Sequence, residues 1–188
     1  MEQSSDKKKI RKRMLALRQE LTKEDVREKS KQICGCLSVQ DVFCESSDIC
    51  LYMPVRNEVD VTLLFEAVWE SGRKLWLPRV NGDNGQMRFY FYDRNTPLIT
   101  GKYHIPEPDS KRCLVPDKNT LVVMPGAAFS KNRERIGYGG GYYDRFLEEN
   151  PMCRTAAVCY DFQILDSILT ELHDKKPEII ISEKRVIF

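Results

Sequence analysis

The sequence predicts an α/β fold built around a largely parallel sheet. Short apolar segments of the kind found in buried strands recur along the chain, at residues 48–53, 74–77, 121–124, 155–160 and 178–182. Helical patterns separate several of these segments, and strands joined by helical crossovers lie parallel in one sheet. The chain of 188 residues is 41% hydrophobic and 31% charged. This length and composition suit one ordinary hydrophobic core, so we expect a single domain over residues 1–188.

Two helices are predicted before the first strand. The first spans Asp6 to about Glu20, where apolar residues recur at spacings of four, three and four: Ile10, Met14, Leu17 and Leu21. Thr22 is followed three residues later by Asp25, which is the arrangement of an N-cap with a capping box, so a second helix begins here. We expect this second helix to run to about Leu37.

The next segments alternate between strand and helix. The strand at 48–53 is ended by a proline, and Asn57 is predicted to cap a helix that stops at Gly72. The apolar face of that helix is Val61, Leu64, Phe65 and Val68. The strand at 74–77 again ends at a proline, and the aromatic-rich residues 86–92 predict another strand after two Asn-Gly turns.

The middle of the chain lacks a clear period until the strand at 121–124. Four prolines lie within residues 97–116, and connections of this length usually cover or build a site. After the strand come a loop and a cluster of glycines, and a helix is then predicted from about Gly141 to Asn150. The last two apolar segments complete the sheet.

Charge is distributed unevenly along the chain. Residues 1–36 contain 11 Lys and Arg against 6 Asp and Glu, a net +5, and the remainder contains 19 against 22, a net −3. The excess is concentrated in residues 7–13. Lys7, Arg11 and Arg18 recur at spacings of four and seven, so they share a helical face that can converge on a single anion. Such a cluster binds phosphates, nucleic acid or a transport receptor, or is a solvated helix face.

Composition also bears on the compartment. No uncharged apolar run reaches the roughly 18 residues of a membrane span, and no apolar stretch of a secretory signal follows the basic N-terminus. The seven cysteines are odd in number and include no C-x-x-C pair, which indicates reduced and mostly buried thiols. We therefore expect a cytoplasmic protein. Cys34 and Cys36 lack the further ligands of a zinc site, since both histidines lie far away in the sequence.

The segment with the clearest chemical content is Arg135–Phe146, with the sequence RIGYGGGYYDRF. Its four glycines lie between a buried strand and a helix, where backbone N–H groups and the helix N-terminus can bind phosphate. The segment is neither a Walker P-loop nor a G-x-G-x-x-G turn. Asp144 falls in the first turn of the helix. It is therefore either a carboxylate that stabilises the helix dipole or, beside a phosphate, a Mg²⁺ ligand.

These residues resemble a known family. Residues 125–129 (PGAAF) and 135–145 (RIGYGGGYYDR) are similar to the 5-formyltetrahydrofolate cyclo-ligases, also called 5,10-methenyltetrahydrofolate synthetases. The resemblance covers essentially the whole chain, and includes the basic K-x-x-x-R helix, Met53-Pro54 with Glu58, Pro78-Arg79 and the Met87-x-Phe89 strand. It implies a three-layer α/β/α Rossmann-like fold with a largely parallel central sheet, similar to the folds of sugar-phosphate isomerases and CoA-transferases.

The resemblance implies an ATP- and Mg²⁺-dependent ring closure. The family converts 5-formyltetrahydrofolate to 5,10-methenyltetrahydrofolate and releases ADP and phosphate. Phosphorylation turns the formyl oxygen, a poor leaving group, into an iminophosphate that folate N10 attacks, and loss of phosphate leaves the methenyl bridge. The enzyme then has mainly to align the reactants and neutralise developing charge. The implied partners are the folate and ATP, without nucleic acid or membrane, and we expect a monomer or a weak dimer.

The resemblance also assigns roles to individual residues. Three basic residues are implied to act in catalysis: Lys7, Arg11 and Arg135. The implied ATP-binding residues are Lys7, Lys8, Lys9, Ile10, Arg11, Arg135, Ile136, Gly137, Tyr138, Gly139, Gly140, Gly141, Tyr142 and Tyr143. The implied folate-binding residues are Met53, Glu58, Met87, Phe89, Glu107, Tyr138, Gly139, Gly140, Gly141 and Tyr142. The implied magnesium ligands are Asp144 and Asp174.

Simpler explanations and rival functions stay open for several of these residues. Glu58 is otherwise a first-turn helix acid, and Met87 and Phe89 are otherwise core packing. Ser130 and Arg133 depart from the family pattern without removing a residue assigned to chemistry. The rival functions are a nucleic-acid-binding protein with the basic segment as its arm, a relative of the sugar-phosphate isomerases or CoA-transferases, and a paralogue that keeps the ATP site with another acceptor.

Overall fold

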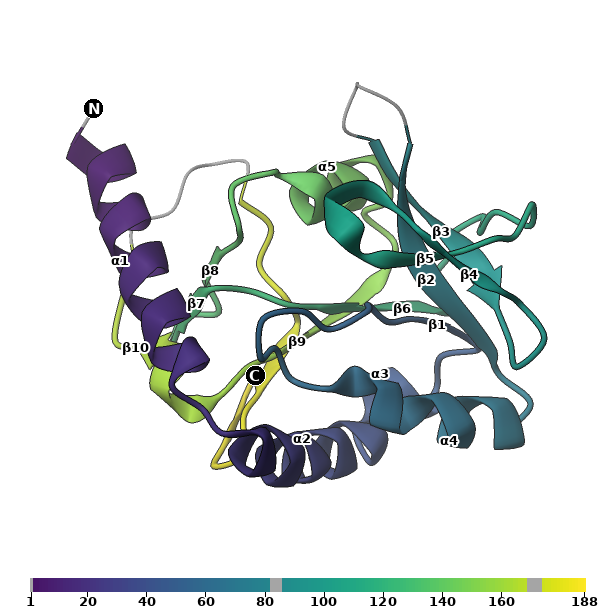
Figure 1. Cartoon of the computed structure of the whole chain (residues 1–188), viewed down its shortest axis with the longest axis horizontal. Coiled ribbons are helices and arrows are strands. Elements are labelled where there is room, and N and C mark those ends of the chain that lie inside the picture. The colour runs from purple at the N-terminus through teal and green to yellow at the C-terminus, as the bar shows by residue number, and fades with distance from the viewer. Residues whose placement is uncertain (1, 82–85, 169–173) are drawn as a thin grey trace.

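The central feature of the computed structural model is a mostly parallel β-sheet (Figure 1). The structure describes residues 2–81, 86–168 and 174–188. Within these ranges seven strands form the sheet, in the order β12-β11-β9-β6-β1-β2-β3. In chain order they are β1 (Asp48–Cys50), β2 (Lys74–Asn81), β3 (Gln86–Tyr92), β6 (Thr120–Met124), β9 (Arg154–Val158), β11 (Ile179–Ile181) and β12 (Val186–Ile187). The inner strands run parallel, and β3 and β12 pair antiparallel at the two edges.

Helices cover both faces of the sheet and so give three layers. Below the sheet in Figure 1 lie α2 (Lys23–Ser38), α3 (Asp41–Cys44), the 3₁₀ helix η1 (Val61–Leu64) and α4 (Phe65–Glu70), and above it lies α5 (Tyr142–Glu149). Successive residues of β1 point to opposite faces, because Ile49 packs in the core cluster of Ile33 from α2, and Cys50 packs in that of Phe146 from α5. The predicted α/β fold with a largely parallel sheet is confirmed.

The N-terminal helix α1 (Glu2–Gln19) packs against a second, smaller sheet (Figure 1). That sheet has the order β10-β7-β8 and consists of β7 (Ala128–Ser130), β8 (Arg135–Ile136) and β10 (Ile164–Leu165), with the 3₁₀ helix η3 (Asp161–Gln163) before β10. Met14 of α1 is 2% exposed and packs in one cluster with Ala128 and Ile136. The apolar stripe predicted on this helix therefore fixes it beside the strands that follow β6.

The proline-rich stretch forms a two-stranded ribbon. β4 (Leu98–Thr100) pairs antiparallel with β5 (Pro106–Pro108), and the 3₁₀ helix η2 (Lys102–His104) joins them. Glu107 of β5 is buried, and its Oε1 accepts a hydrogen bond from the Val80 N–H of β2 at 3.2 Å. This buried carboxylate docks the ribbon onto the edge of the main sheet.

The start of α2 is confirmed at the level of its hydrogen bonds. The Thr22 hydroxyl accepts a bond from the Asp25 N–H at 3.1 Å, and the Asp25 carboxylate accepts one from the Thr22 N–H at 3.0 Å. These two bonds satisfy donors at a helix N-terminus that otherwise have no partner, which stabilises a helix by about 1 kcal/mol. The sequence pattern was specific enough here because both partners lie within three residues.

The predicted cap at Asn57 is wrong. The Asp60 side chain accepts the Thr62 N–H at 3.1 Å and caps η1, so the helical segment begins three residues later than expected. Asn57 instead has a φ of 56°, and its side-chain amide donates to the carbonyl oxygens of Arg18 at 3.2 Å and Leu21 at 3.1 Å. A tertiary contact with α1 therefore decides the conformation of this turn.

Two strand boundaries also differ from the expectation. The first strand ends at Cys50 instead of Met53. The second does not end at Pro78, because β2 continues through it to Asn81 in antiparallel pairing with β3. Pairing with β1 stops at Trp76, so Pro78 lies where the opposite side of the strand has no partner in the sheet and the missing N–H does no harm.

The strand order places a topological switch point at the carboxyl ends of β1 and β6. After β1 the chain moves to β2 on one side, whereas β6 lies on the other side of β1. Connections that leave the carboxyl ends of β1 and β6 therefore diverge, and ligands of open α/β sheets bind at such a switch point. The segments that follow these two strands begin at Leu51 and at Pro125, and both carry residues that the sequence marked as functional.

The cysteines are mostly buried, as expected from the sequence. All seven cysteines are free, and burial raises the pKa of Cys34 to about 12. Among the helices that the structure describes, none is long and apolar enough to cross a membrane. Cys34 and the other buried thiols are accordingly unreactive core residues.

Candidate active site

The glycine segment forms a loop that ends at the N-terminus of α5. Gly139 has a φ of 100° and Gly141, the residue before the helix, has a φ of 64°. The φ of Gly139 lies where residues with a Cβ are strained, and the left-handed φ of Gly141 favours glycine without requiring it. A cavity of about 370 Å³ opens here, within the range of ligand sites, and is lined by Gly139, Gly140, Gly141, Asp144, Arg145 and Glu148.

Arg135 lies beneath this loop and is 5% exposed. Its Nη2 donates to Asp144 Oδ1 at 2.8 Å and its Nη1 donates to the Pro125 carbonyl at 3.3 Å, while the guanidinium lies 5.7 Å from the centre of the Tyr143 ring. Its Nε is buried and has no hydrogen-bond partner among the described residues. A buried cation with an unused N–H is suited to an additional acceptor such as a phosphate oxygen.

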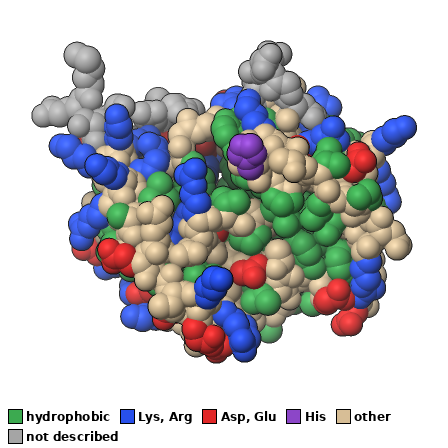
Figure 2. Space-filling view, viewed as in Figure 1, with side chains coloured by type: hydrophobic (Ala, Val, Ile, Leu, Met, Phe, Trp, Pro, Cys, Tyr) green, Lys and Arg blue, Asp and Glu red, His purple; other side chains and the backbone are tan. Residues whose placement is uncertain are grey.

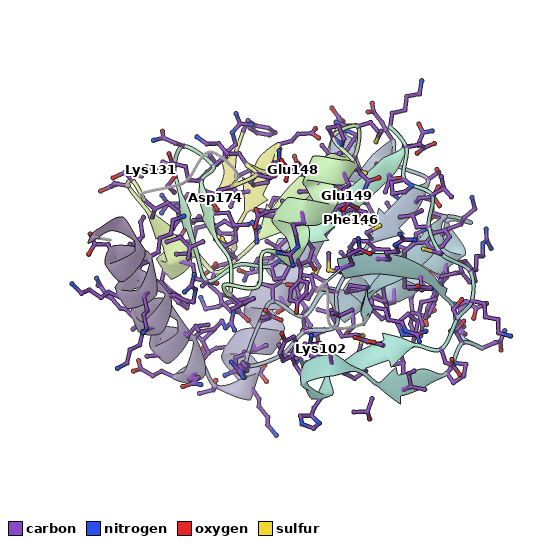
Figure 3. The ribbon with its side chains drawn as sticks, turned by 90° about the horizontal axis from the view of Figure 1, so that it is seen from above. Lys102, Lys131, Phe146, Glu148, Glu149 and Asp174 are labelled. Atoms are coloured by element: carbon purple, nitrogen blue, oxygen red, sulfur yellow. The ribbon has the colours of Figure 1, made fainter. Side chains whose placement is uncertain are left out.

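The two acidic residues expected to bind metal are brought to the same place. Asp144 Oδ1 also accepts the backbone N–H of Lys175 at 3.1 Å, so the residue next to Asp174 is in direct contact with α5. Asp174 in turn forms an ion pair with Lys7 of α1 at 2.7 Å. Figure 3 shows Asp174 between the side of the small sheet, where Lys131 is labelled, and α5 with Glu148. Across the ranges that the structure describes, no group of three or more His, Cys, Asp or Glu side chains is arranged to hold a metal ion.

The basic segment of α1 makes two contacts near the loop. Lys7 pairs with Asp174, and Arg11 Nε donates to the Gly137 carbonyl of the loop at 2.8 Å. Lys8 and Lys9 are exposed, and Lys9 lies 3.8 Å from the Asp6 carboxylate. Ile10 packs in the apolar cluster that holds the helix on the small sheet. Among residues 7–11, Arg11 therefore contacts the loop and Lys7 contacts Asp174, whereas Lys8 and Lys9 face solvent and Ile10 packs in the core.

A second group of charged residues lies where the segments after β1 and β6 meet. Tyr138 of the glycine loop donates a hydrogen bond from its hydroxyl to Glu58 Oε1, and the same hydroxyl lies 3.3 Å from the Gly126 carbonyl. Arg18 Nη1 donates to the Tyr138 hydroxyl at 2.5 Å. Glu58 and Arg18 are 5% and 2% exposed. These contacts join α1, the turn after β1 and the glycine loop.

Burial determines the protonation behaviour of this group. Desolvation raises the pKa of Glu58 above its ordinary value, although the Tyr138 hydroxyl, the Val55 N–H and the Arg18 charge act in the opposite direction. The pKa of Tyr138 is also raised, first by burial of its hydroxyl and then by the Glu58 charge. Tyr138 as a whole is 41% exposed, so its ring is accessible while its polar end is enclosed.

Arg18 has a different partner in the structure from Lys7 and Arg11, with which its helical spacing grouped it. Its spacing from Lys7 and Arg11 predicted a common anion, but Lys7 pairs with Asp174, Arg11 with a carbonyl, and Arg18 with Tyr138 beside Glu58. Helical spacing fixes the face from which a side chain leaves and says nothing about which loop meets it. No local signal in the sequence indicated that Tyr138 folds back onto this arginine.

The other expected folate residues lie deeper or are held by the protein. Met87 and Phe89 are 8% and 1% exposed and belong to the core under α5, where the Phe89 and Phe146 rings lie 5.0 Å apart. Met53 is partly buried and packs against the larger core cluster. Glu107 is committed to the ribbon contact with β2. Contact of these four residues with a folate stays a prediction.

The ribbon also reaches the glycine loop. Tyr103 of η2 and Tyr142 share a hydrogen bond between their hydroxyl groups at 2.8 Å, and the guanidinium of Arg145 lies 5.3 Å from the Tyr142 ring. Figure 2 shows a hollow between the side of α1, where Lys and Arg side chains gather, and the side of the ribbon, where hydrophobic side chains gather. Leu98, Ile99 and Tyr103 are the large exposed apolar residues of the ribbon.

A wider depression of about 500 Å³ lies elsewhere, at the amino ends of β1 and β2. It is lined by Cys44, Glu45, Ser46, Ser47, Ser71 and Arg73. The Arg73 guanidinium is already satisfied there by the Phe43 carbonyl at 2.6 Å and by the Phe43 ring, 4.4 Å away. Most of the residues that the resemblance marks as functional lie instead around the glycine loop, beyond the carboxyl ends of β1 and β6.

Comparisons with known proteins agree with this arrangement. The model of the 5-formyltetrahydrofolate cyclo-ligase family matches residues 3–183. The chain is 25% identical to the 5-formyltetrahydrofolate cyclo-ligase of Escherichia coli strain K12 over 174 residues, which cover 90% of this chain and 96% of the relative. The NMR structure of Aquifex aeolicus 5,10-methenyltetrahydrofolate synthetase superposes with a TM-score of 0.85 at 30% identity, over 96% of this chain and 91% of that one.

A 5,10-methenyltetrahydrofolate synthetase from Mycoplasma pneumoniae has the same fold, with a TM-score of 0.73 at 24% identity over 95% of this chain and 99% of that one. The family match includes α1, the turn after β1, the glycine loop and Asp174, which are joined by the contacts of Lys7, Arg11, Arg18 and Tyr138. The chain therefore belongs to the 5-formyltetrahydrofolate cyclo-ligase family, which is a family of ligases.

Proposed function

We propose that the chain converts 5-formyltetrahydrofolate to 5,10-methenyltetrahydrofolate with Mg-ATP and releases ADP and phosphate. One observation carries the proposal within this family: basic residues from two distant parts of the sequence are joined by contacts around the glycine loop. Arg11 bonds to the Gly137 carbonyl, Arg135 to Asp144, and Lys7 to Asp174, whose neighbour Lys175 bonds to Asp144. Cations, backbone N–H groups and a helix N-terminus form a site for phosphate, and carboxylates beside it suit a divalent cation.

The cations at this site are paired with carboxylates and can exchange them for phosphate oxygens. Lys7 holds Asp174 and Arg135 holds Asp144, so the four charges neutralise one another. When ATP binds, Lys7 and Arg135 turn to its phosphates, and the unused Nε of Arg135 gains an acceptor. Arg11 stays beside the loop through the Gly137 carbonyl and adds a third positive charge.

The carboxylates released in this exchange fit a magnesium ion. Mg²⁺ is commonly held by one or two carboxylates together with phosphate oxygens and water, and the donor set here is Asp144 and Asp174. When bound, the ion supplies neutralisation of charge on the phosphate oxygens. Asp144 is well suited to this role, because the Lys175 N–H still holds its side chain after Arg135 has turned to the phosphates.

The chemistry requires alignment more than proton transfer. The formyl oxygen attacks the γ-phosphorus and the bond to ADP breaks; N10 then attacks the formyl carbon, phosphate leaves with the electrons of the C–O bond, and N10 loses its proton. Lys7, Arg11 and Arg135 stabilise the charge that develops on the transferred group. Glu58 accepts hydrogen bonds from N–H groups of the pterin and orients the formyl group toward the phosphate. We also propose a cytoplasmic location, where the seven thiols stay reduced.

An absorbance assay tests the reaction directly. Purified protein, 5-formyltetrahydrofolate and Mg-ATP are mixed, and formation of the methenyl product is followed in the near ultraviolet. We expect product only when all three are present, with ADP and phosphate released in equal amounts. ATP binding without product would contradict the folate as acceptor and support a paralogue that acts on another group.

A further inference from the structure

The Tyr138 hydroxyl lies between two buried groups of opposite charge. It donates a hydrogen bond to Glu58 Oε1 and accepts one from Arg18 Nη1. The two charged groups are themselves close, since Nη1 lies 3.9 Å from Glu58 Oε1. A buried acceptor and a buried donor are therefore adjacent, and one small polar group satisfies both.

Glu58 and Arg18 are fixed by contacts that do not involve Tyr138. Glu58 Oε2 accepts the Val55 N–H at 2.9 Å. Arg18 Nε donates to the Arg56 carbonyl at 2.8 Å, so the arginine is tied to the same turn that carries the glutamate. The acceptor and the donor thus keep their relative position whether or not the hydroxyl lies between them.

Tyr138, in contrast, lies on the glycine loop. Gly137 precedes it and Gly139, with a φ of 100°, follows it. The ring is accessible and only the hydroxyl end is enclosed, so the side chain can withdraw without opening the core. Withdrawal without replacement is strongly unfavourable, because Glu58 Oε1 and Arg18 Nη1, both buried, each lose the hydrogen bond with the Tyr138 hydroxyl.

Arg18 has a further donor that the protein does not use. Its Nη2 is buried and has no hydrogen-bond partner among the described residues. Buried guanidinium N–H groups are nearly always satisfied, so an unused one beside a candidate ligand site points to a ligand acceptor. An acceptor that replaces the Tyr138 hydroxyl between Arg18 and Glu58 would meet this donor as well as Nη1.

We propose that Glu58 and Arg18 together recognise a cyclic amide edge, the adjacent N3–H and C4=O of the substrate's pterin, and that the Tyr138 hydroxyl holds this position until the substrate displaces it. The inference rests on the proposed function, because it takes a folate as the ligand that reaches Glu58. The ring N–H donates to the carboxylate and the carbonyl oxygen accepts from the guanidinium, which reproduces both hydrogen bonds of the hydroxyl. Arg18 is then a residue that determines specificity.

This pairing discriminates between 4-oxo and 4-amino pterins. A 4-amino pterin presents an amino donor where the guanidinium also presents donors, and its N3 carries no hydrogen for the Glu58 carboxylate, so both pairs of groups are mismatched in a buried site. A site that hydrogen-bonds a polar group of its ligand strongly rejects analogues without that group, because the buried groups of the protein then lose their partner. If Arg18 had a purely structural role, the wild type and the Arg18 variants would show the same ratio of dissociation constants for the two pterins.

Binding without turnover tests the inference. Dissociation constants are measured without ATP for 5-formyltetrahydrofolate and for its 4-amino-4-deoxy analogue. The variants are Arg18→Met, Arg18→Lys and Tyr138→Phe. Arg27→Met is the control, since this α2 arginine has a side chain that is 64% exposed and forms an ion pair with Glu28 of the same helix. Circular dichroism verifies that each variant is folded, and Arg18→Lys keeps the charge beside Glu58 if the methionine variant fails to fold.

We expect the wild type and Arg27→Met to prefer the 4-oxo ligand by about tenfold or more, and both Arg18 variants to lose most of that preference. Tyr138→Phe should bind the 4-oxo ligand at least as tightly as the wild type, because it removes the competing hydroxyl. An unchanged preference in folded Arg18 variants overturns the inference and leaves the proposed function intact. Weakening by tenfold in Tyr138→Phe overturns the displacement step. A wild type that neither binds nor converts the folate overturns the proposed function and the inference with it.

Discussion

Single charged residues at the site serve both the fold and the proposed chemistry. Asp144 illustrates this, because a carboxylate in the first turn of α5 is favoured by the helix dipole and is also bonded to Arg135. The dipole contribution of an aspartate is worth about 0.3–1 kcal/mol, whereas loss of a group that neutralises transferred phosphate affects the rate by orders of magnitude. The two roles are therefore separable by measurement.

Asp144→Asn should lower kcat by about a hundredfold or more, because the amide cannot carry the negative charge that holds a divalent cation. The free energy of unfolding should fall by about 1–3 kcal/mol, since buried Arg135 loses the charge of its partner while the amide oxygen can still accept its hydrogen bond. Product formation and thermal melting check the two numbers. Glu149→Gln, on an exposed residue of the same helix that is labelled in Figure 3, is the control and should change neither. Unfolding of Asp144→Asn would show that its role is structural.

The raised pKa of Glu58 predicts a specific pH dependence. Between the ordinary value of 4.5 and the higher pKa of the folded protein, the unfolded chain releases this proton while the folded chain retains it. The contribution of Glu58 to the free energy of unfolding therefore falls as pH rises through this window, and is constant above it. Denaturant unfolding of the wild type and Glu58→Gln from pH 4.5 upward should show the wild type losing stability relative to the variant. A parallel pH dependence of the two proteins would contradict the assignment.

At the residue scale, the sequence was most informative where partners are close in the chain. Thr22 and Asp25 were identified as a capping box because three residues separate them. Arg18 and Tyr138 are 120 residues apart, and nothing local to either indicated the contact. The same reason explains Asn57, whose side chain bonds to carbonyls of α1 instead of capping a helix.

At the scale of elements, the strands that were predicted are those with continuous apolar runs. β6 and β11 are buried on both faces and leave a clear signal. β7, β8, β10 and β12 were not predicted as strands from an apolar run, and they exist because of pairing with distant partners, whereas the equally short β11 was recognised from its three isoleucines. The continuation of β2 beyond Pro78 likewise depends on its pairing with β3.

The glycines provide a test at this scale. Gly139→Ala should raise the KM for ATP and destabilise the chain by about 1–2 kcal/mol, because a φ of 100° is strained for any residue with a Cβ. Space is not the obstacle, since the nearest atom to a Cβ there is 3.8 Å away on Arg11. Gly35→Ala is the matched control: it lies inside α2 with nothing within 4 Å of the added carbon, so it should stabilise by about 0.5–1 kcal/mol. Steady-state kinetics measure the KM for ATP, and thermal melting measures the stability, of both variants.

At the scale of the whole molecule, the basic N-terminal segment is partly turned inward. The Lys7 side chain is 14% exposed and Arg11 bonds to the glycine loop, so the positive charge is used within the chain as well as at its surface. This arrangement favours a small phosphate ligand over a nucleic-acid arm, which would present its cations together to solvent. The basic segment could be identified from the sequence, whereas the partners of Lys7 and Arg11 depend on the fold.

Binding of Mg-ATP should stabilise the whole fold, because the site joins α1, the glycine loop and the segment before β11. A ligand at a hundred times its dissociation constant adds about 2.7 kcal/mol to the free energy of unfolding, or roughly 5–11 °C in Tm for a chain of this size. Removal of the metal with a chelator should abolish most of the increase. Lys7→Met should also reduce it, whereas Lys12→Met, an exposed lysine of the same helix, should keep it. An equal increase in both variants would remove Lys7 from the phosphate site.

The ion pair between Lys7 and Asp174 has a consequence for the order in which the molecule is completed. The two residues are 167 positions apart, so at a synthesis rate of about 5–20 residues per second the helix that carries Lys7 waits roughly 8–33 seconds for its partner to be made. The apolar stripe of this helix can pack once β7 and β8 have been made, but Lys7 cannot pair until Asp174 follows. Docking of α1 on the small sheet and completion of the proposed phosphate site are therefore separate events in synthesis, and the second comes after β9 has been made.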